Sequence, residues 1–230
     1  MRRFRHLSVL EWALGFAGVW LVVALVVGVV VQLAGADSAP GASPLECGRR
    51  LSSVSGERLT LRSVRVVVAL DEEWREQFGD RSESVARSLV SDVSGLYRDI
   101  GMYFLPVRIA DWSSPNDLDS AEELLVDLND AIPLDDADVI LGFTGQELPD
   151  VDGFAPVGGR IAVIGHHRGS PERDVLVLAH EVGHLFGAHH GCDIPGLAGV
   201  MAASGFEDPL VVCPCTREIL EANVARFHED

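Results

Sequence analysis

The chain has 230 residues, and its 35 Asp and Glu residues outnumber its 18 Lys and Arg residues, which gives a formal net charge of -17. An acidic surface repels the phosphates of nucleic acids and anionic lipids, so the composition argues against a nucleic-acid-binding protein. After an apolar N-terminal stretch and a linker, enough chain is left for one globular domain with a sizeable core.

The N-terminal segment combines positive charge with a long apolar run. Residues 1–11 contain three arginines, and residues 13–31 carry no charge. As a helix this run is about 28 Å long, close to the thickness of the hydrocarbon core of a bilayer. We therefore expect a basic cytoplasmic N-terminus (1–11), a transmembrane signal anchor (12–34) and a domain on the extracytoplasmic side of the cell membrane. The alternative is a signal peptide cleaved near Ala36, which would release a secreted domain.

Residues 35–56 are rich in Ala, Gly, Ser and Pro, which predicts a linker or a short pro-segment. The folded domain is expected over residues 57–230. Disulfides are permitted in an exported domain. Cys213 and Cys215 flank one proline, and so short a loop strains disulfide geometry. We expect Cys192 to pair with one of these two, and Cys47 is the candidate partner of the other.

The folded part begins with strand and helix patterns in alternation. β-branched runs predict strands, and apolar residues at helical spacing predict the helices between them. The expected elements are, in order, a strand over 64–70, a helix over 82–100, a strand over 103–109, a helix from the cap Ser120 to just before Pro133, and a strand over 137–143.

Strands that alternate with helices at this spacing predict an α/β fold with a mostly parallel, twisted sheet. Residues 153–165 then hold two short β segments without a helix between them. Such a segment can add an antiparallel edge strand to the sheet, and an ordinary hairpin is the alternative. An open edge could bind an extended peptide by backbone pairing. The residues expected to do so are Arg160, Ile161, Ala162, Val163 and Ile164.

A further helix is expected to begin at Pro171, with Ser170 as its cap, and to end at Gly187. The last helix of the chain is expected to be capped by Thr216.

Residues 180–190 read HEVGHLFGAHH, which contains the pattern H-E-x-x-H-x-x-G-x-x-H. His180 and His184 lie four residues apart on one helix, so their rings project from the same face and can share a metal ion. Gly187 can adopt the left-handed conformation that turns the chain back and brings in His190 as a third ligand. Three imidazoles with an open fourth position describe a catalytic site for one Zn²⁺. Glu181, beside the first ligand, is the expected general base.

Three other histidines lie near this pattern. The spacing from the glycine favours His190 as the ligand, so we expect His189 to be a solvated neighbour. His166 and His167 precede the helix and are expected to be loop residues rather than ligands.

The extended pattern resembles the motif of the metzincin clan of zinc endopeptidases. Metzincins also have a Met-turn beneath the metal, and Met201 lies eleven residues after His190. The stretches GFAPVGG and IAVI are most similar to the adamalysin (reprolysin) branch, whereas DIPGLAGVMAAS has matrixin-like features. The resemblance implies a zincin-like fold with an active-site helix, a Met-turn and a C-terminal helix, in which Gly187 and Met201 support the site. Gly191 stands where adamalysins have Asp and matrixins Ser, so the subfamily stays open.

These features predict a zinc-dependent metalloendopeptidase that hydrolyses peptide or protein substrates, with Glu181 as the general base. Two alternatives are a catalytically inactive, membrane-tethered zinc-binding or adaptor domain and a zinc hydrolase of a non-peptide amide. A protein that only holds a metal does not require Glu181, which argues against the inactive domain. Cys47-Gly48 resembles the matrixin pair that covers the zinc in a latent enzyme, although a disulfide at Cys47 is the preferred interpretation. The sequence defines neither the substrate nor the oligomeric state.

Overall fold

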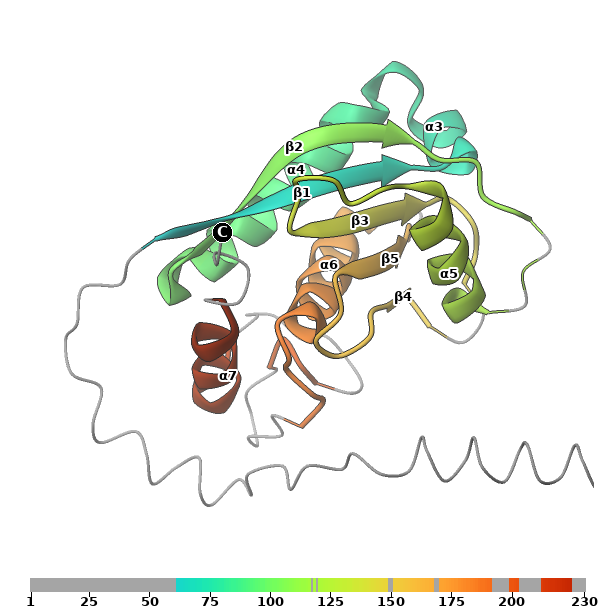
Figure 1. Cartoon of the computed structure of the whole chain (residues 1–230). Coiled ribbons are helices and arrows are strands. Elements are labelled where there is room, and N and C mark those ends of the chain that lie inside the picture. The colour runs from blue at the N-terminus through green and yellow to red at the C-terminus, as the bar shows by residue number, and fades with distance from the viewer. Residues whose placement is uncertain are drawn as a thin grey trace, which may run out of the picture. The chain divides into compact units, whose positions relative to one another are not determined.

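The computed structural model describes residues 61–116, 118, 120–148, 151–167, 170–191, 199–202 and 212–224 (Figure 1). The elements in this part of the chain are β1 (Arg62–Leu70), α3 (Glu72–Phe78), η2 (Gly79–Arg81), α4 (Ser82–Tyr97), η3 (Arg98–Ile100), β2 (Met102–Asp111), α5 (Ala121–Ala131), β3 (Val139–Thr144), β4 (Gly153–Phe154), β5 (Ile161–Gly165), α6 (Pro171–Leu185) and α7 (Pro214–Val224).

Five strands form one sheet in the order β2-β1-β3-β5-β4. β1 pairs in parallel with β2 and β3, and β3 pairs in parallel with β5. β4 alone among these strands is antiparallel, and it pairs with β5. The mostly parallel sheet with one antiparallel edge strand confirms the fold class predicted from the sequence.

The identity of the edge strand differs from the prediction. Residues 160–164 were expected to form the open edge, but β5 is hydrogen-bonded to β3 on one side and to β4 on the other. Val163 and Ile164 are therefore already paired on both sides, and Ala162, Val163 and Ile164 are buried. The prediction of an open edge at Arg160 to Ile164 is wrong, and the exposed edge beside α6 belongs to β4.

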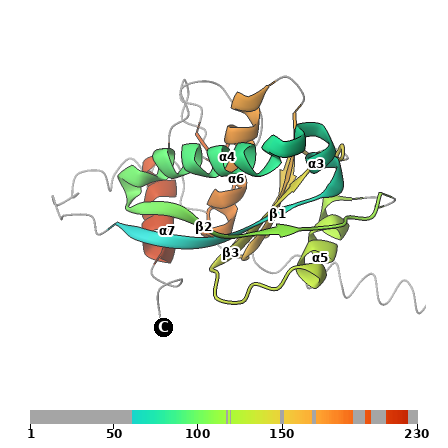
Figure 2. The same ribbon diagram turned by 90° about the horizontal axis from the view of Figure 1, so that it is seen from above.

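Helices cover both faces of the sheet (Figure 2). α4 and α6 lie on one face, where β1 contributes Val64, Val66 and Val68 to the larger apolar cluster. α5 lies on the other face, where its Leu124 and Leu128 pack in a smaller cluster. The alternation of strand side chains between the two faces fixes this three-layer arrangement.

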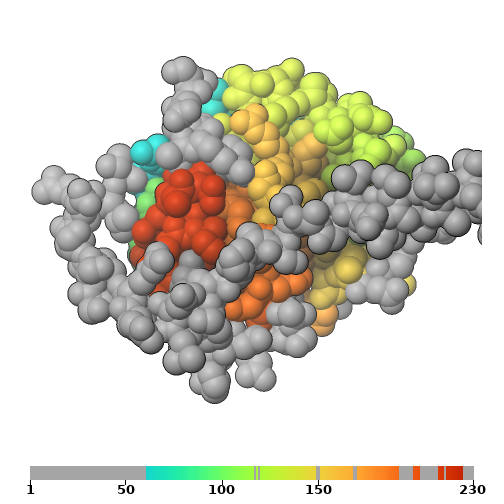
Figure 3. Space-filling view, turned by 60° about the horizontal axis from the view of Figure 1, so that its bottom comes forward, coloured from blue at the N-terminus to red at the C-terminus, as the bar shows by residue number. Residues whose placement is uncertain are grey.

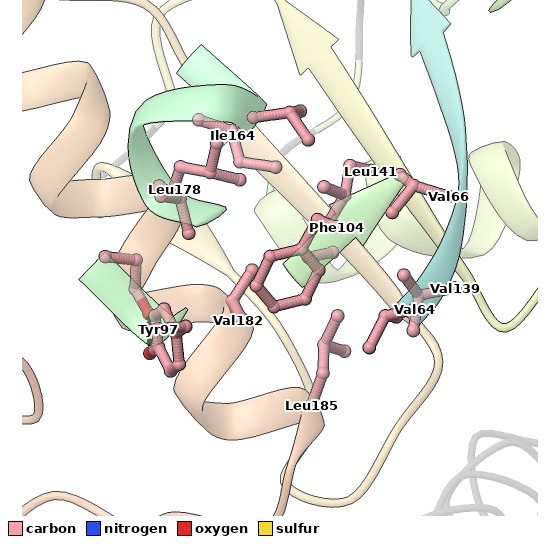
Figure 4. Packing of buried hydrophobic residues seen from close by; sticks show 14 of the residues in the cluster. Val64, Val66, Tyr97, Phe104, Val139, Leu141, Ile164, Leu178, Val182 and Leu185 are labelled. Carbon is pink, nitrogen blue, oxygen red and sulfur yellow. Dashed lines mark hydrogen bonds between the residues drawn. The ribbon is translucent and has the colours of Figure 1, made fainter. Parts of the chain in front are cut away.

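The apolar face of α6 fastens this helix to the sheet. Leu178, Val182 and Leu185 follow one another at helical spacing, are buried, and lie around the ring of Phe104 (Figure 4). Burying an aliphatic side chain of this size contributes about 1.5–3 kcal/mol. The Tyr97 hydroxyl of α4 adds a hydrogen bond to the Ala179 carbonyl at 2.7 Å. The helix that carries the H-E-x-x-H residues is thus rigidly held.

The helix termini follow the sequence in most cases. The hydroxyl of Ser120 accepts a hydrogen bond from the Glu123 amide at the start of α5, as expected. Ser170 occupies the N-cap position of α6, as expected, but its side chain makes no capping hydrogen bond. The expected cap Thr216 is wrong, because α7 begins at Pro214 and Thr216 lies inside the helix.

One helix, α3, is absent from the sequence-based elements. Asp71 caps α3 by accepting a hydrogen bond from the Trp74 amide at 2.7 Å, and Glu72 and Glu73 occupy the first turn. An Asp followed by acidic residues is a helix-start pattern, so the sequence did carry a usable signal.

The predicted membrane location requires a correction. Within the part of the chain that the structure describes, no helix is long and apolar enough to cross a membrane. The segment 12–34, on which the prediction of a single-pass protein rested, lies outside the described residues.

Candidate metal centre and cleft

The three histidines of the motif meet at one point. His180 and His184 project from the same side of α6, and His190 lies after the turn that follows the helix. The Nε2 atom of His180 is 3.1 Å from that of His184 and 3.0 Å from that of His190, and the His184–His190 distance is 3.0 Å. Nitrogen ligands of tetrahedral zinc, with bonds of about 2.0–2.1 Å, lie about 3.3–3.4 Å apart, so a small outward movement would fit the ion.

Backbone carbonyl groups set the orientation of two of these rings. The Nδ1 of His180 is 2.8 Å from the Val200 carbonyl oxygen, and the Nδ1 of His184 is 2.8 Å from the Ala188 carbonyl oxygen. A carbonyl oxygen only accepts hydrogen bonds, so both Nδ1 atoms carry the proton. In the neutral rings the two Nε2 atoms that face each other then carry lone pairs. These lone pairs repel each other unless a cation lies between them. The donor set therefore fits a metal ion.

The electrostatics agree with neutral, metal-binding imidazoles. Burial lowers the pKa of His180, and it lowers the pKa of His184 to about 4. The hydrogen bond from each ring to a carbonyl group acts in the opposite direction but does not cancel the effect of burial. His190 is more exposed than the other two. His189 is exposed and does not belong to the cluster.

The turn after α6 depends on Gly187, whose φ is 88°. This left-handed conformation suits glycine, and it reverses the chain toward His190. A Cβ atom at this position would also lie 2.8 Å from Nδ2 of Asn223 in α7. The packing of α7 against the turn is visible in Figure 3, where red α7 adjoins the orange end of α6.

Met201 lies directly beneath the site. It is fully buried, and its Sδ atom is 2.2 Å from the position that a Cβ atom on Gly183 would occupy. Gly183 separates the two ligands of α6, so the absence of a side chain there lets Met201 pack against the helix. The preceding residue, Val200, supplies the carbonyl group that orients His180.

Glu181 is buried at 5% exposure on the cleft side of α6. Burial, and next the negative charge of Asp152, raise the pKa of Glu181 to about 8. A carboxyl group with such a pKa can hold a proton near neutral pH.

An open cleft of about 1230 Å³ runs over the three histidines. One wall is α6, and the other is the segment 151–157, which contains β4. The two walls are in close contact at Gly153, where a Cβ atom would lie 2.9 Å from Cγ of Glu181 and 2.9 Å from Cγ1 of Val177. Residues 151–154 did not figure among the predicted site residues, although the Asp-Gly pair before an apolar residue is a recognisable turn and close-approach signal.

The structure describes the side chain of one of the four cysteines, Cys213. Cys213 is buried and disulfide-bonded. Cys47, Cys192 and the side chain of Cys215 lie outside the described part of the chain, so the pairing pattern stays a prediction.

The fold and the histidine cluster together are those expected of a metallopeptidase of the metzincin type. Residues 60–205 match the reprolysin-type model of Metallo-peptidase family M12, which is more than half of the chain. The chain therefore belongs to Metallo-peptidase family M12, and the predicted resemblance to the metzincin clan is confirmed.

One curated protein is similar to the chain in sequence, and two solved structures are similar to it in fold. The mouse protein "Disintegrin and metalloproteinase domain-containing protein 12" is 26% identical over 229 aligned residues, which cover 83% of this chain and 24% of that protein. The chain thus spans about a quarter of the length of this curated relative. Archaemetzincin from Methanopyrus kandleri has the same fold, with a TM-score of 0.52, 22% identity, and coverage of 71% of this chain and 97% of that chain. A chain from a chaperone-substrate complex also shares the fold, with a TM-score of 0.55, 12% identity, and coverage of 73% of this chain and 35% of that chain.

Proposed function

We propose that this family M12 protein is an active zinc-dependent endopeptidase that binds one Zn²⁺ through His180, His184 and His190. The observation that carries the proposal is the triangle of Nε2 atoms, two of which have lone pairs fixed toward each other by backbone carbonyl groups. When bound, zinc would supply Lewis-acid chemistry, which lowers the pKa of water and polarises the scissile carbonyl group.

Glu181 would act as the general base. Its carboxyl group lies on the cleft side of α6, next to the first ligand, and it is shielded from bulk water. A nearby cation favours the carboxylate form that accepts a proton from water, whereas burial favours the protonated form. The balance between the two effects lets Glu181 take up a proton from the attacking water and donate it to the leaving amine.

Substrate binding is assigned to β4 rather than to the predicted residues Arg160 to Ile164. β4 pairs with β5 on one side, and its other side faces the cleft. An extended peptide can therefore add to the sheet beside β4, with its scissile bond near Glu181. Such binding uses the backbone of the substrate and accounts for action on peptides rather than on a small non-peptide amide.

Substitution of the general base tests the proposal against an inactive zinc-binding domain. The full-length chain, loaded with zinc, is expected to cleave a peptide library, and Glu181→Gln is expected to reduce kcat by at least about a hundredfold, because proton transfer by a positioned residue contributes that much. Zinc content, measured by atomic emission, should be unchanged. His184→Gln is the companion variant, and it should lose the metal.

Two results would contradict the proposal. Full activity of Glu181→Gln would reject the assigned base. Absence of peptide cleavage by the zinc-loaded wild-type chain, over the whole library, would favour the inactive zinc-binding domain.

A further inference from the structure

β4 is weakly attached to the sheet for a strand that forms one wall of a cleft. It has two residues, and their register on β5 covers only Gly153 with Ile164 and Phe154 with Val163. One further backbone bond, from the Gly165 amide to the Asp152 carbonyl oxygen at 2.9 Å, holds the start of the strand. At the far end of the segment, the Gly158 amide donates to the His184 carbonyl oxygen at 2.8 Å.

A side-chain network reinforces the start of β4. The Nε2 atom of His167 lies 2.6 Å from Oδ1 of Asp152, and its Nδ1 lies 3.2 Å from Oδ1 of Asp174 in α6. The backbone amide of His167 also donates to that oxygen of Asp174, at 2.8 Å. Carboxylate oxygens accept hydrogen bonds, so the ring donates to both partners when it carries two protons and is positively charged.

The α6 end of this network is anchored in the core. Asp174 has a side chain only 3% exposed, and its Oδ2 lies 2.6 Å from Nδ1 of His166. The ring of His166 in turn packs edge-on against Trp74 and Phe78, at centroid distances of 5.6 and 4.9 Å. Asp174 is thus a fixed point from which His167 can hold Asp152.

Arg173 of α6 also binds Asp152, with Nη2 2.5 Å and Nε 3.2 Å from Oδ2. Its side chain is 51% exposed, whereas that of His167 is 21% exposed. Solvent screens an ion pair more strongly when its side chains are exposed, so the His167 contact is the more shielded of the two.

We propose that His167 is a positioning residue, whose ring bridges Asp174 of α6 and Asp152 and thereby holds the edge strand β4 at its working distance from Glu181. The inference deepens the proposed function, since it assumes that β4 binds the substrate. His167 itself touches neither the three metal-site histidines nor Glu181 in any contact found among the described residues.

Hydrogen exchange at the Gly165 amide tests the bridge without reference to activity. In the zinc-loaded full-length chain this amide is expected to be protected by its bond to Asp152. His167→Phe, which keeps an aromatic ring but removes both ring nitrogens, is expected to speed its exchange by about tenfold or more. Arg173→Gln should have a smaller effect. Arg108→Gln is the matched control. Arg108 lies on β2, the strand at the opposite edge of the sheet, and forms an ion pair with Asp135 at 3.4 Å. Its loss should leave the exchange of the Gly165 amide unchanged.

Kinetics with peptides of increasing length separate positioning from a general structural role. His167→Phe is expected to raise KM for a long peptide by about tenfold while kcat and zinc content change little, and to have less effect on a short peptide that makes few bonds to β4. A general loss of structure would instead lower kcat for every length.

If His167→Phe does not fold, Asp152→Asn removes the partner charge at similar size and gives the same expected change in exchange. Only its exchange is compared, because the charge of Asp152 also raises the pKa of Glu181. Unchanged exchange at Gly165 in the folded variants would overturn the inference, whatever their activity. If the wild-type chain cleaves no peptide but Gly165 exchange still rises in His167→Phe, the proposed function fails and the bridge stands.

Discussion

Gly183 and Met201 show how a residue that touches no substrate can determine the metal site. A side chain on Gly183 would collide with Sδ of Met201, which lies 2.2 Å from the Cβ position. Met201 follows Val200, whose carbonyl group orients His180. Any movement of Met201 is therefore passed to a ligand ring through one hydrogen bond.

Gly183→Ala is predicted to lower zinc affinity by about 10- to 100-fold, the range found when the hydrogen-bond partners of metal ligands are removed. Competition with a chromophoric chelator would measure the change. The control is Gly95→Ala in α4, where a Cβ atom meets nothing within 4 Å. This control should keep zinc affinity and stabilise the fold by about 0.5–1 kcal/mol, since alanine is the better helix former. Equal zinc affinity in Gly183→Ala and wild type would contradict the account of the Met-turn.

At the scale of elements, α6 carries two faces with different tasks. Leu178, Val182 and Leu185 face the core, whereas His180, Glu181 and His184 face the cleft. The neighbouring helix α4 contacts α6 through Tyr97, a fully buried residue. Burial raises the pKa of the Tyr97 hydroxyl above its ordinary value, so the group stays a neutral donor to the Ala179 carbonyl oxygen.

Tyr97→Phe is predicted to reduce the free energy of unfolding by about 1–2 kcal/mol, because the hydrogen bond is lost and a buried carbonyl group loses its extra donor. Denaturant titration would measure the loss, and zinc affinity should change little. Tyr103→Phe on β2 is the control, since the Tyr103 side chain makes no hydrogen bond to another described residue and is half-buried. A Tyr97→Phe chain as stable as wild type would show that α6 is held by apolar packing alone.

At the scale of the whole molecule, the local patterns of the sequence predicted the strands and helices well. The β-branched run up to Leu70 predicted a strand, and the spacing of apolar residues after Ser82 predicted a helix. The structure has β1 and α4 at these positions. The H-E-x-x-H spacing also predicted the convergence of two rings, because helix geometry places residues four apart on one face. The turn expected at Gly187 predicted that His190 would join them.

Features that depend on distant contacts were not predictable in the same way. Both β segments of residues 153–165 are short, and only the pairing of β5 with β3 shows that β4 is the outer strand. Likewise, nothing in the sequence of His166 and His167 reveals that Asp152 and Asp174 lie beside them, since the bonds join separate segments across the fold. His166 and His167 lie in a loop and outside the histidine cluster, as expected, and the sequence did not show that they also bond to these two carboxylates.

The most direct test of the account is X-ray absorption spectroscopy at the zinc edge on the full-length chain, together with the zinc content of the same sample. The predicted result is one zinc per chain, coordinated by three imidazole nitrogens and one oxygen at about 2.0–2.1 Å. The absence of stoichiometric zinc, or fewer than three imidazoles in the coordination shell, would contradict the claim that His180, His184 and His190 hold a catalytic ion.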